Sequence, residues 1–159
     1  MEMSGEVKIS APRDRVWAAL NDPVVLQAAI PGCSELIRVS DSEMSAIVTA
    51  KVGMIKAAFK GSVTLSNVRP PEGYTIAGQG KGGVAGFASG AADVALDEQN
   101  GETVLRYLAR GQVGGKLAQI GGRLIDATAK HMADQFFANL AAVVGDKESA
   151  VPGDAVAAD

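Results

Sequence analysis

The sequence predicts an α+β fold in which a curved antiparallel sheet of seven strands wraps around one long C-terminal helix. From residue 33 to residue 113, apolar and polar residues alternate with period two between short, turn-like links. From residue 116 to Val144, apolar residues instead recur at the three- and four-residue spacing of a helix. The 159 residues are enough for one domain with one core.

One strand and two short helices are predicted before the period-two region. Residues 5–10, GEVKIS, alternate as a strand does, and residues 11–30, APRDRVWAALNDPVVLQAAI, have helical periodicity. An Asn-Asp-Pro sequence at 21–23 divides the helical segment into two, and Pro-Gly at 31–32 ends it. The chain is therefore expected to begin as strand, helix, helix.

Six further strands are predicted from the period-two region. The links between them, VSDSE, VGM, RPPE, KGGVA and DEQNGE, are too short for the crossover connections that parallel strands need. Asn100-Gly101 is typical of a tight β-hairpin. We therefore expect an antiparallel sheet and the element order strand, two helices, six strands, helix.

The long helix is predicted to end at Gly145, because glycine is typical of a C-terminal helix stop. At a rise of about 1.5 Å per residue it would be roughly 43 Å long, enough to lie across a whole curved sheet. Residues 146–159, DKESAVPGDAVAAD, have too little apolar bulk to offset their ordering entropy. We therefore predict one folded domain over residues 1–145 and a disordered tail over residues 146–159.

Charge and composition exclude several classes of partner and location. The net charge is -3 and the basic residues are scattered along the chain, so we expect no basic stripe for nucleic acid or anionic lipid. The longest apolar run, residues 136–145, is shorter than the roughly 18 residues that span a bilayer, which leaves only peripheral membrane contact open. The lone Cys33 and an N-terminus without the build of a signal peptide fit a cytoplasmic protein.

A glycine-rich stretch at residues 78–90, GQGKGGVAGFASG, contains the letters of the dinucleotide-binding fingerprint G-x-G-x-x-G. That fingerprint needs a strand before its glycines and a helix after them, whereas here one predicted strand follows another. The glycines before Lys116 do precede a helix, but they lack the spacing of a phosphate-binding loop. We therefore expect neither motif to bind a nucleotide.

The predicted inner faces of the strands carry unusually small residues. On one strand, Ala57 and Gly61 share a face with Phe59 and Val63. The small inward positions on the other strands are Ala46, Ala50, Ala88, Gly90, Ala92, Ala109 and Gly111. Such a sheet is hard to fill to normal packing density around a single helix, so we expect an apolar cavity between them.

The long helix is predicted to form the other wall of the cavity. Its broad apolar face is expected to carry Gly121, Leu124, Ile125, Thr128, Met132, Gln135, Phe136, Asn139 and Val143. Thr128, Gln135 and Asn139 are polar groups within this face, and they either orient a ligand or bond to backbone or water. The predicted ligand-binding residues are Ala46, Val48, Ala50, Ala57, Phe59, Val63, Ile76, Ala92, Leu105, Tyr107, Ala109, Leu124, Thr128, Met132, Gln135 and Phe136.

Residue types that carry catalysis are sparse. His131 is the only histidine, so no second histidine completes a metal site, and Cys33 is expected to pack as a small hydrophobic residue. Asp93 is expected on the outer face of its strand, and the other candidate carboxylates of the sheet region fall in turns: Asp41, Glu43, Asp97, Glu98 and Glu102. We expect no catalytic residue, no metal and no cofactor.

Four segments carry a resemblance to a known family. RVWAALNDPVVLQAAIPGCSEL, VTAKVGMIKAAFKGSVTL, GQGKGGVAGFASGAADVAL and VGGKLAQIGGRLIDATAKHMADQFFANL resemble the G subunit of carbon monoxide dehydrogenase. They cover most of residues 6–144, and the element order resembles the helix-grip fold of the START-like, pollen-allergen-like superfamily. The resemblance implies an accessory protein, without a catalytic role of its own, encoded beside molybdenum hydroxylases of the carbon monoxide or xanthine dehydrogenase type. It would act there in membrane recruitment, maturation or electron delivery.

Three hypotheses for the function stay open. The first is a carrier for an elongated apolar molecule: a quinone, an isoprenoid or a fatty acyl chain. The second is a module that binds the molybdenum hydroxylase, with an incidental cavity and with Phe137 as a candidate docking contact on the polar side of the helix. The third is a cyclase or hydrolase of the kind found elsewhere in the superfamily. Homodimerisation is also left open, and attachment through the hydrophobic C-terminal anchor of some relatives is not expected, because the chain stops at Asp159.

Overall fold

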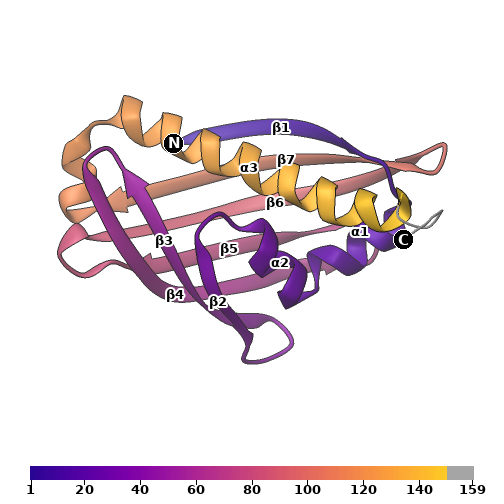
Figure 1. Cartoon of the computed structure of the whole chain (residues 1–159), viewed down its shortest axis with the longest axis horizontal. Helices are drawn as coiled ribbons and strands as arrows, with labels where there is room; N and C mark the ends of the chain where they lie inside the picture. Colours follow the sequence, from indigo (N-terminus) through magenta and orange to yellow (C-terminus); the bar gives the residue numbers. More distant parts are fainter. Residues whose placement is uncertain (150–159) are drawn as a thin grey trace.

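Seven strands form one antiparallel sheet in the computed structural model, which describes residues 1–149 (Figure 1). The elements are β1 (Glu2–Ile9), α1 (Arg13–Leu20), α2 (Pro23–Ala29), β2 (Cys33–Arg38), β3 (Glu43–Val52), β4 (Ile55–Arg69), β5 (Gly73–Lys81), the 3₁₀ turn η1 (Gly83–Ala85), β6 (Phe87–Gln99), β7 (Glu102–Gly114), the 3₁₀ segment η2 (Gly115–Ile120) and α3 (Gly122–Ser149). The predicted α+β class, the antiparallel pairing and the order of strands and helices are confirmed.

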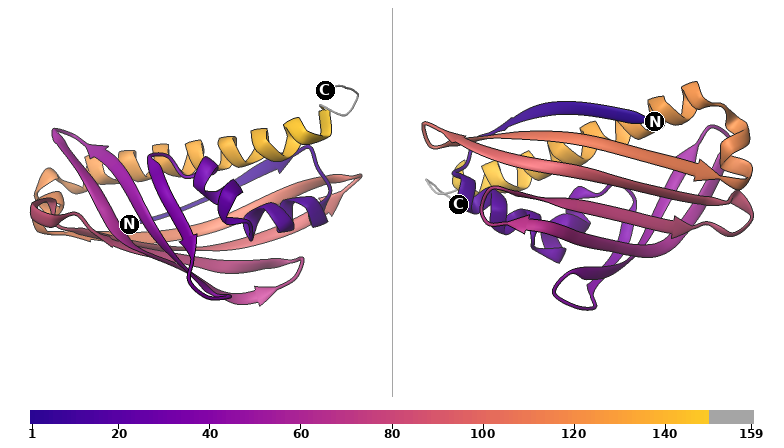
Figure 2. Two further views of the ribbon diagram at one scale, coloured as in Figure 1. Left: turned by 60° about the horizontal axis from the view of Figure 1, so that its bottom comes forward. Right: turned by 180° about the vertical axis from the view of Figure 1, so that it is seen from behind.

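The strand order across the sheet is β1-β7-β6-β5-β4-β3-β2. Strands β2 to β7 pair with their neighbours in sequence, and β1 completes the sheet by pairing with β7. The β6–β7 turn contains Asn100 and Gly101, both with positive φ, as a tight hairpin requires. The sheet curves around α3, which runs along its inner face (Figures 1 and 2).

The two short helices close one end of the inner face, beside the C-terminal half of α3 (Figure 2). Helix α2 begins at Pro23, where proline is well tolerated, and the side chain of Asp22 caps it by accepting a hydrogen bond from Val24 N at 2.9 Å. The Asn-Asp-Pro break predicted from the sequence is therefore the N-terminus of α2.

The core lies at this same end. Its largest fully buried side chains include Leu20, Leu26, Tyr74, Leu96, Leu105 and Leu140. Tyr74 Oη donates a hydrogen bond of 2.7 Å to the carbonyl oxygen of Leu20, which ties β5 to α1. Asn139 Nδ2 donates at 3.0 Å to the carbonyl oxygen of Ala29, which ties α3 to the end of α2.

Both ends of the long helix differ from the prediction. Residues 115–120 form the separate segment η2, and Gly121 has a φ of +107°, which no continuous helix can pass through, so α3 begins only at Gly122. Helix α3 continues past Gly145 to Ser149, because glycine weakens a helix without ending it unless the backbone turns left-handed. Residues 150–159 of the predicted tail lie outside the described residues.

Candidate functional site

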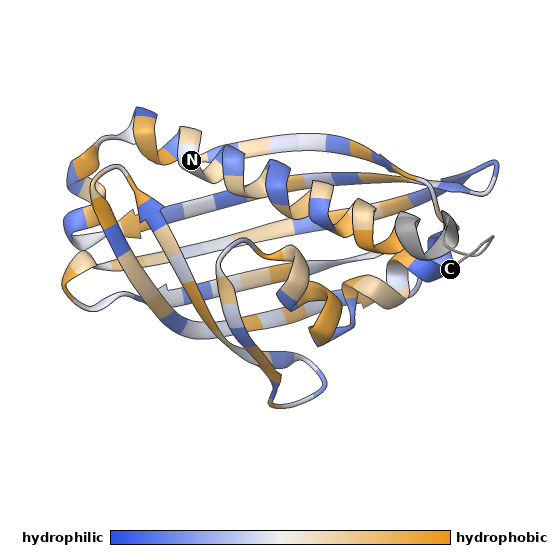
Figure 3. Cartoon of the chain, viewed as in Figure 1, coloured by the Kyte–Doolittle hydropathy of each residue, from blue (hydrophilic) through white to orange (hydrophobic). Residues whose placement is uncertain are grey.

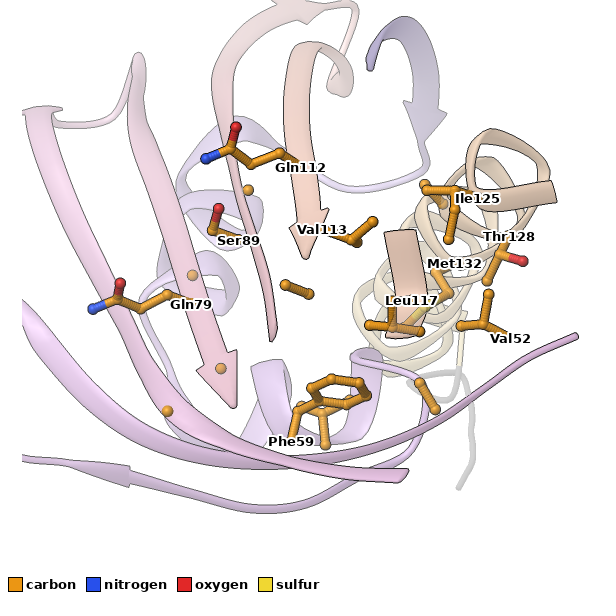
Figure 4. Close-up of a pocket in the computed structure, with 18 of the residues that line it drawn as sticks. Val52, Phe59, Gln79, Ser89, Gln112, Val113, Leu117, Ile125, Thr128 and Met132 are labelled. Carbon is orange, nitrogen blue, oxygen red and sulfur yellow. The ribbon is translucent and has the colours of Figure 1, made fainter. Parts of the chain in front are cut away.

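A cavity of about 310 Å³ lies between α3 and the half of the sheet that is far from α1 and α2 (Figure 4). Strands β3 to β7 all contribute inward-facing residues to it, and η2 and the first turns of α3 complete its wall. The lining residues are Met1, Ala46, Val48, Ala50, Val52, Phe59, Gly61, Ser62, Val63, Gly78, Gln79, Gly80, Ala88, Ser89, Gly90, Gln112, Val113, Leu117, Ile125, Thr128, Ala129 and Met132.

The cavity exists because side chains on the inner face become smaller at the same level of three neighbouring strands. At the packed end, Tyr74 of β5 lies opposite Val94 of β6, which lies opposite Tyr107 of β7. Four residues further along, the same three strands present glycines that are again direct cross-strand partners: Gly78, Gly90 and Gly111. The antiparallel register therefore aligns three glycines in a row. Gly78 and Gly90 line the cavity, and the side chain of Met1 lies in front of Gly111.

Gly78 and Gly61 both line the cavity, but each position is a glycine for a different physical reason. A Cβ on Gly78 would have only the carbonyl oxygen of Ser62 nearby, at 3.7 Å, so this position has free space in front of it. A Cβ on Gly61 would collide with the carbonyl oxygen of Gln79, because the backbones of β4 and β5 approach closely there. Gly78 makes room in the cavity, whereas Gly61 is required by the sheet itself.

The interior of the cavity is apolar. Phe59, Val113, Leu117, Ile125 and Met132 surround the space, and no Asp, Glu, Lys, Arg or His side chain is among the lining residues (Figure 4). The polar lining side chains are Ser62, Gln79, Ser89, Gln112 and Thr128. The polar ends of Gln79, Ser89 and Gln112 point away from the apolar residues of the interior (Figure 4). The site can therefore bury apolar surface, and it offers few polar groups to its interior.

The structure brings together about half of the predicted ligand-binding residues. Those that line the cavity are Ala46, Val48, Ala50, Phe59, Val63, Thr128 and Met132. Those that do not are Ala57, Ile76, Ala92, Leu105, Tyr107, Ala109, Leu124, Gln135 and Phe136. Leu105 and Tyr107 are buried in the core, and Ile76, Ala92, Ala109 and Phe136 pack against that core. Ala57 is the cross-strand partner of Ala50 but lies just outside the cavity.

Leu124, Gln135 and Phe136 do not line the cavity, because the apolar face of α3 is rotated relative to the predicted one. Leu124 is 43% exposed and Gln135 is exposed, whereas Phe137, predicted on the polar side, is 6% exposed. Phe137 stacks on Tyr107 with ring centroids 4.4 Å apart and belongs to the core. The prediction of Phe137 as a docking contact is therefore wrong. Helical periodicity predicts a broad apolar face on the helix. Which residues of that face are buried most deeply depends on the sheet residues that pack against it.

The polar residues of α3 have mostly structural partners. Gln135 Nε2 donates at 2.9 Å to Asn139 Oδ1, and Asn139 in turn donates to the backbone of Ala29. For Asn139, bonding to backbone is the alternative that the structure supports. Thr128 is the one of the three that lines the cavity.

Several lining residues were not among the predicted ones. Val52 and Val113 continue the period-two phase of Ala50 and Gly111, so alternation alone could have included them. Leu117 is buried in η2, and Met1 reaches the cavity because its carbonyl oxygen accepts a hydrogen bond from Gly111 N at 3.1 Å. Neither placement has a local sequence signal.

The titratable side chains lie outside the cavity. Cys33 packs against the core, and burial raises the pKa of its thiol above the ordinary value, which disfavours the reactive thiolate. Asp93 is on the outer face of β6 as expected; it accepts a hydrogen bond from Thr75 Oγ1 at 2.7 Å, which lowers the pKa of its carboxyl. Within residues 1–149, no group of His, Cys, Asp or Glu side chains is placed to hold a metal ion.

No helix in this part of the chain has both the length and the hydropathy that crossing a bilayer requires.

Solved structures share this fold over nearly their whole length. A conserved protein from Geobacillus kaustophilus superposes with a TM-score of 0.85 at 25% identity, covering 92% of this chain and 97% of its own. A START superfamily protein from Mycobacterium smegmatis gives 0.70 at 12% identity, covering 92% and 98% of the two chains. The ZhuI aromatase/cyclase from Streptomyces sp. R1128 gives 0.67 at 14% identity, covering 97% and 99%. No curated protein matches the chain.

The START superfamily neighbour confirms the predicted helix-grip fold. Residues 5–145 match the family described as the G subunit of carbon monoxide dehydrogenase (CoxG), so the match spans nearly all of the described domain, including both walls of the cavity. This chain therefore belongs to the carbon monoxide dehydrogenase CoxG family.

Proposed function

We propose that this protein binds an elongated apolar molecule in its cavity and serves, as a non-catalytic accessory protein, a molybdenum hydroxylase of the carbon monoxide or xanthine dehydrogenase type. The family and the START-like fold favour the binding of a hydrophobic ligand. The observation that carries the proposal is the lining of the cavity, which is apolar in its interior and free of ionisable side chains. A charged ligand would find no counter-ion among them, whereas an apolar one gains about 25 cal/mol per Å² of buried area.

The ligand classes that fit are a quinone, an isoprenoid and a fatty acyl chain. Each has a long apolar part that can occupy the interior, and Thr128 of α3 is a polar side chain in its lining. The volume of about 310 Å³ is at the lower end of the roughly 300–1,000 Å³ typical of small-molecule sites. A quinone is the favoured ligand, because the partner enzymes implied by the family are redox enzymes.

Native mass spectrometry of protein purified from its own host, followed by lipid extraction, tests the proposal. We expect a bound isoprenoid or acyl chain in the purified protein. Added to verified ligand-free protein at about 100 times its Kd, the same compound should stabilise the fold by about 2.7 kcal/mol and raise the Tm. A ligand-free preparation whose Tm does not respond to quinones, isoprenoids or fatty acids would refute the carrier function.

The alternative of a cyclase or hydrolase has less support. The aromatase/cyclase neighbour shares the fold at 14% identity, which says nothing about shared chemistry. None of the side chains that line the cavity is a carboxylic acid, an imidazole, an amine or a thiol. Turnover of a polyketide or ester substrate by the purified chain would reverse this assignment.

A further inference from the structure

Three connections meet at the end of the molecule that is opposite α1 and α2, and we define them together as the tip: residues 51–60, 81–87 and 114–125. They are the β3–β4 turn, the β5–β6 loop with η1, and η2 with the start of α3, all at the left of Figure 1. They are in contact, since a Cβ on Gly53 would lie 3.1 Å from Leu124, and a Cβ on Gly86 would collide with the carbonyl oxygen of Gly114.

The tip gathers positive charge. It holds Lys51, Lys56, Lys60, Lys81, Lys116 and Arg123, and all six are exposed. It contains none of the 18 acidic residues of the chain, although the net charge of the chain is -3. The basic residues are scattered along the sequence, but the fold brings together cations from three distant segments at this end.

None of these six cations forms an ion pair within the described part of the chain. Lys51 lies directly opposite Lys56 on the β3–β4 hairpin, and Lys60 lies directly opposite Lys81. Like charges at directly opposed positions of a sheet are destabilising. The ion pairs of the described residues are elsewhere, on the outer face of the sheet and along α3. The tip therefore has an electrostatic cost that an external anionic surface would relieve.

The tip also exposes apolar side chains beside these cations. Met54 is 97% exposed at the β3–β4 turn, and Val84 is 86% exposed in η1. Phe87 and Leu124 are about half exposed beside them, and hydrophobic residues are visible in these connections in Figure 3. Apolar side chains that project between lysines are the pattern by which peripheral proteins insert into the boundary between lipid headgroups and acyl chains.

We propose that the tip is a docking surface for an anionic lipid bilayer. A protein partner fits less well, because five of the six cations are lysines, which are depleted at protein interfaces, and neither Trp nor Tyr is present in the tip. The tip includes Val52, Phe59, Leu117 and Ile125, which line the cavity. Docking would therefore place the cavity next to the acyl layer. The proposal rests on the charges and exposed side chains of the tip and does not depend on what the cavity holds.

Flotation of the full chain with lipid vesicles tests the docking surface. We expect the protein to bind vesicles of phosphatidylcholine mixed with phosphatidylglycerol, to bind phosphatidylcholine alone weakly, and to be released as salt screens the lysines. The variant with Lys51→Ser and Lys56→Ser should bind the anionic vesicles roughly thirtyfold more weakly. It should fold normally, because the substitutions remove a like-charge pair.

Two matched variants test whether the exposed apolar side chains of the tip contribute to vesicle binding, or whether an acidic substitution anywhere on the surface has the same effect. Met54→Asp should also abolish most vesicle binding, whereas Val24→Asp should not, although Val24 is 77% exposed on α2 at the other end. Failure of the wild-type chain to bind anionic vesicles, or full binding by the Met54→Asp and lysine variants, would overturn the proposal. Loss of binding to a purified hydroxylase in these variants, without any vesicle binding by wild type, would assign the tip to a protein instead.

The Tm response to an apolar ligand separates this proposal from the carrier function. The tip variants should keep the full ligand response of the wild type, because Lys51, Lys56 and Met54 do not line the cavity. Vesicle binding without any ligand response would leave the docking surface standing and refute the carrier function.

Discussion

The two ends of the sheet are built on the same strands but from side chains of very different size. At the end covered by α1 and α2, Tyr74, Leu96 and Leu105 are fully buried against Leu20 and other core residues. At the other end, Gly78 and Gly90 line a cavity of about 310 Å³, and Gly111 is the cross-strand partner of Gly90. A dry, enclosed void of this size would cost about 7 kcal/mol, comparable to the roughly 5–15 kcal/mol that stabilises a whole domain.

The contrast teaches that stability and binding are separated along the strands. An underfilled region can persist only if a well-packed region supplies the free energy of folding, and strands β3 to β7 contribute to both. The two ends should therefore respond differently to shortened side chains. At the packed end such a substitution should lower the stability of the fold strongly, whereas at the cavity end it should change mainly the affinity for the ligand.

The largest effect is expected from Leu140→Ala, which deletes a fully buried side chain of α3 at the packed end. The free energy of unfolding should fall by about 2–5 kcal/mol, as measured by denaturant melts. The matched variant Met132→Ala, two turns earlier on α3, should cost about 1 kcal/mol or less, because Met132 already faces the cavity. Equal losses in the two ligand-free variants would show that the two ends are packed alike.

The next largest effect is expected from Tyr74→Phe, which removes the hydroxyl that donates to the Leu20 carbonyl. The loss of stability should be about 1–2 kcal/mol, because a buried carbonyl is left without its partner. Burial also raises the pKa of Tyr74, so the neutral phenol stabilises the fold below the ordinary tyrosine pKa of about 10. The wild type should therefore lose stability as the pH rises above that value, and Tyr74→Phe should lose less. If the wild type and Tyr74→Phe lose stability equally as the pH rises, this role of Tyr74 is contradicted.

A smaller effect with a distinctive sign is expected from Ala50→Leu. The new side chain enters the cavity, so ligand-free stability should stay level or rise by up to about 1 kcal/mol. Ligand affinity should fall about tenfold or more, measured by displacement of a fluorescent lipid. Ala57→Leu is the control, because Ala57 lies directly opposite Ala50 but outside the cavity. If Ala50→Leu destabilises the protein and leaves affinity unchanged, the space in front of Ala50 is not a binding site.

The smallest effect is expected on the outer face of β6, which belongs to neither end. The hydrogen bond from Thr75 lowers the pKa of Asp93, so its contribution to stability is present above the ordinary Asp pKa and is lost as the pH falls through the lowered value. Since Asp93 is exposed, Asp93→Asn should cost only a few tenths of a kcal/mol at neutral pH. In melts at decreasing pH, the stabilities of the wild type and Asp93→Asn should converge. A difference in stability that grows toward low pH would contradict the stabilising role of the ionised Asp93.

The sequence predicts the strands and helices well, but it does not predict how they pack against one another. The period-two pattern, the short links and Asn100-Gly101 were sufficient for the antiparallel sheet. The rotation of α3 was not predictable, because the position of Phe137 depends on Tyr107, a residue of β7. The predicted cavity extended over inward residues such as Leu105 because nothing local in the sequence says where α1 and α2 cover the sheet.

The sequence alone determines which side of each strand faces inward and how large each inward side chain is, because both follow from alternation along a single segment. Only the tertiary structure decides that Gly78, Gly90 and Gly111 are neighbours, and that Lys51, Lys81 and Lys116 share one tip. Strand register and the meeting of distant loops are set by packing between segments that no local pattern relates. The cavity and the charged tip are both products of that packing.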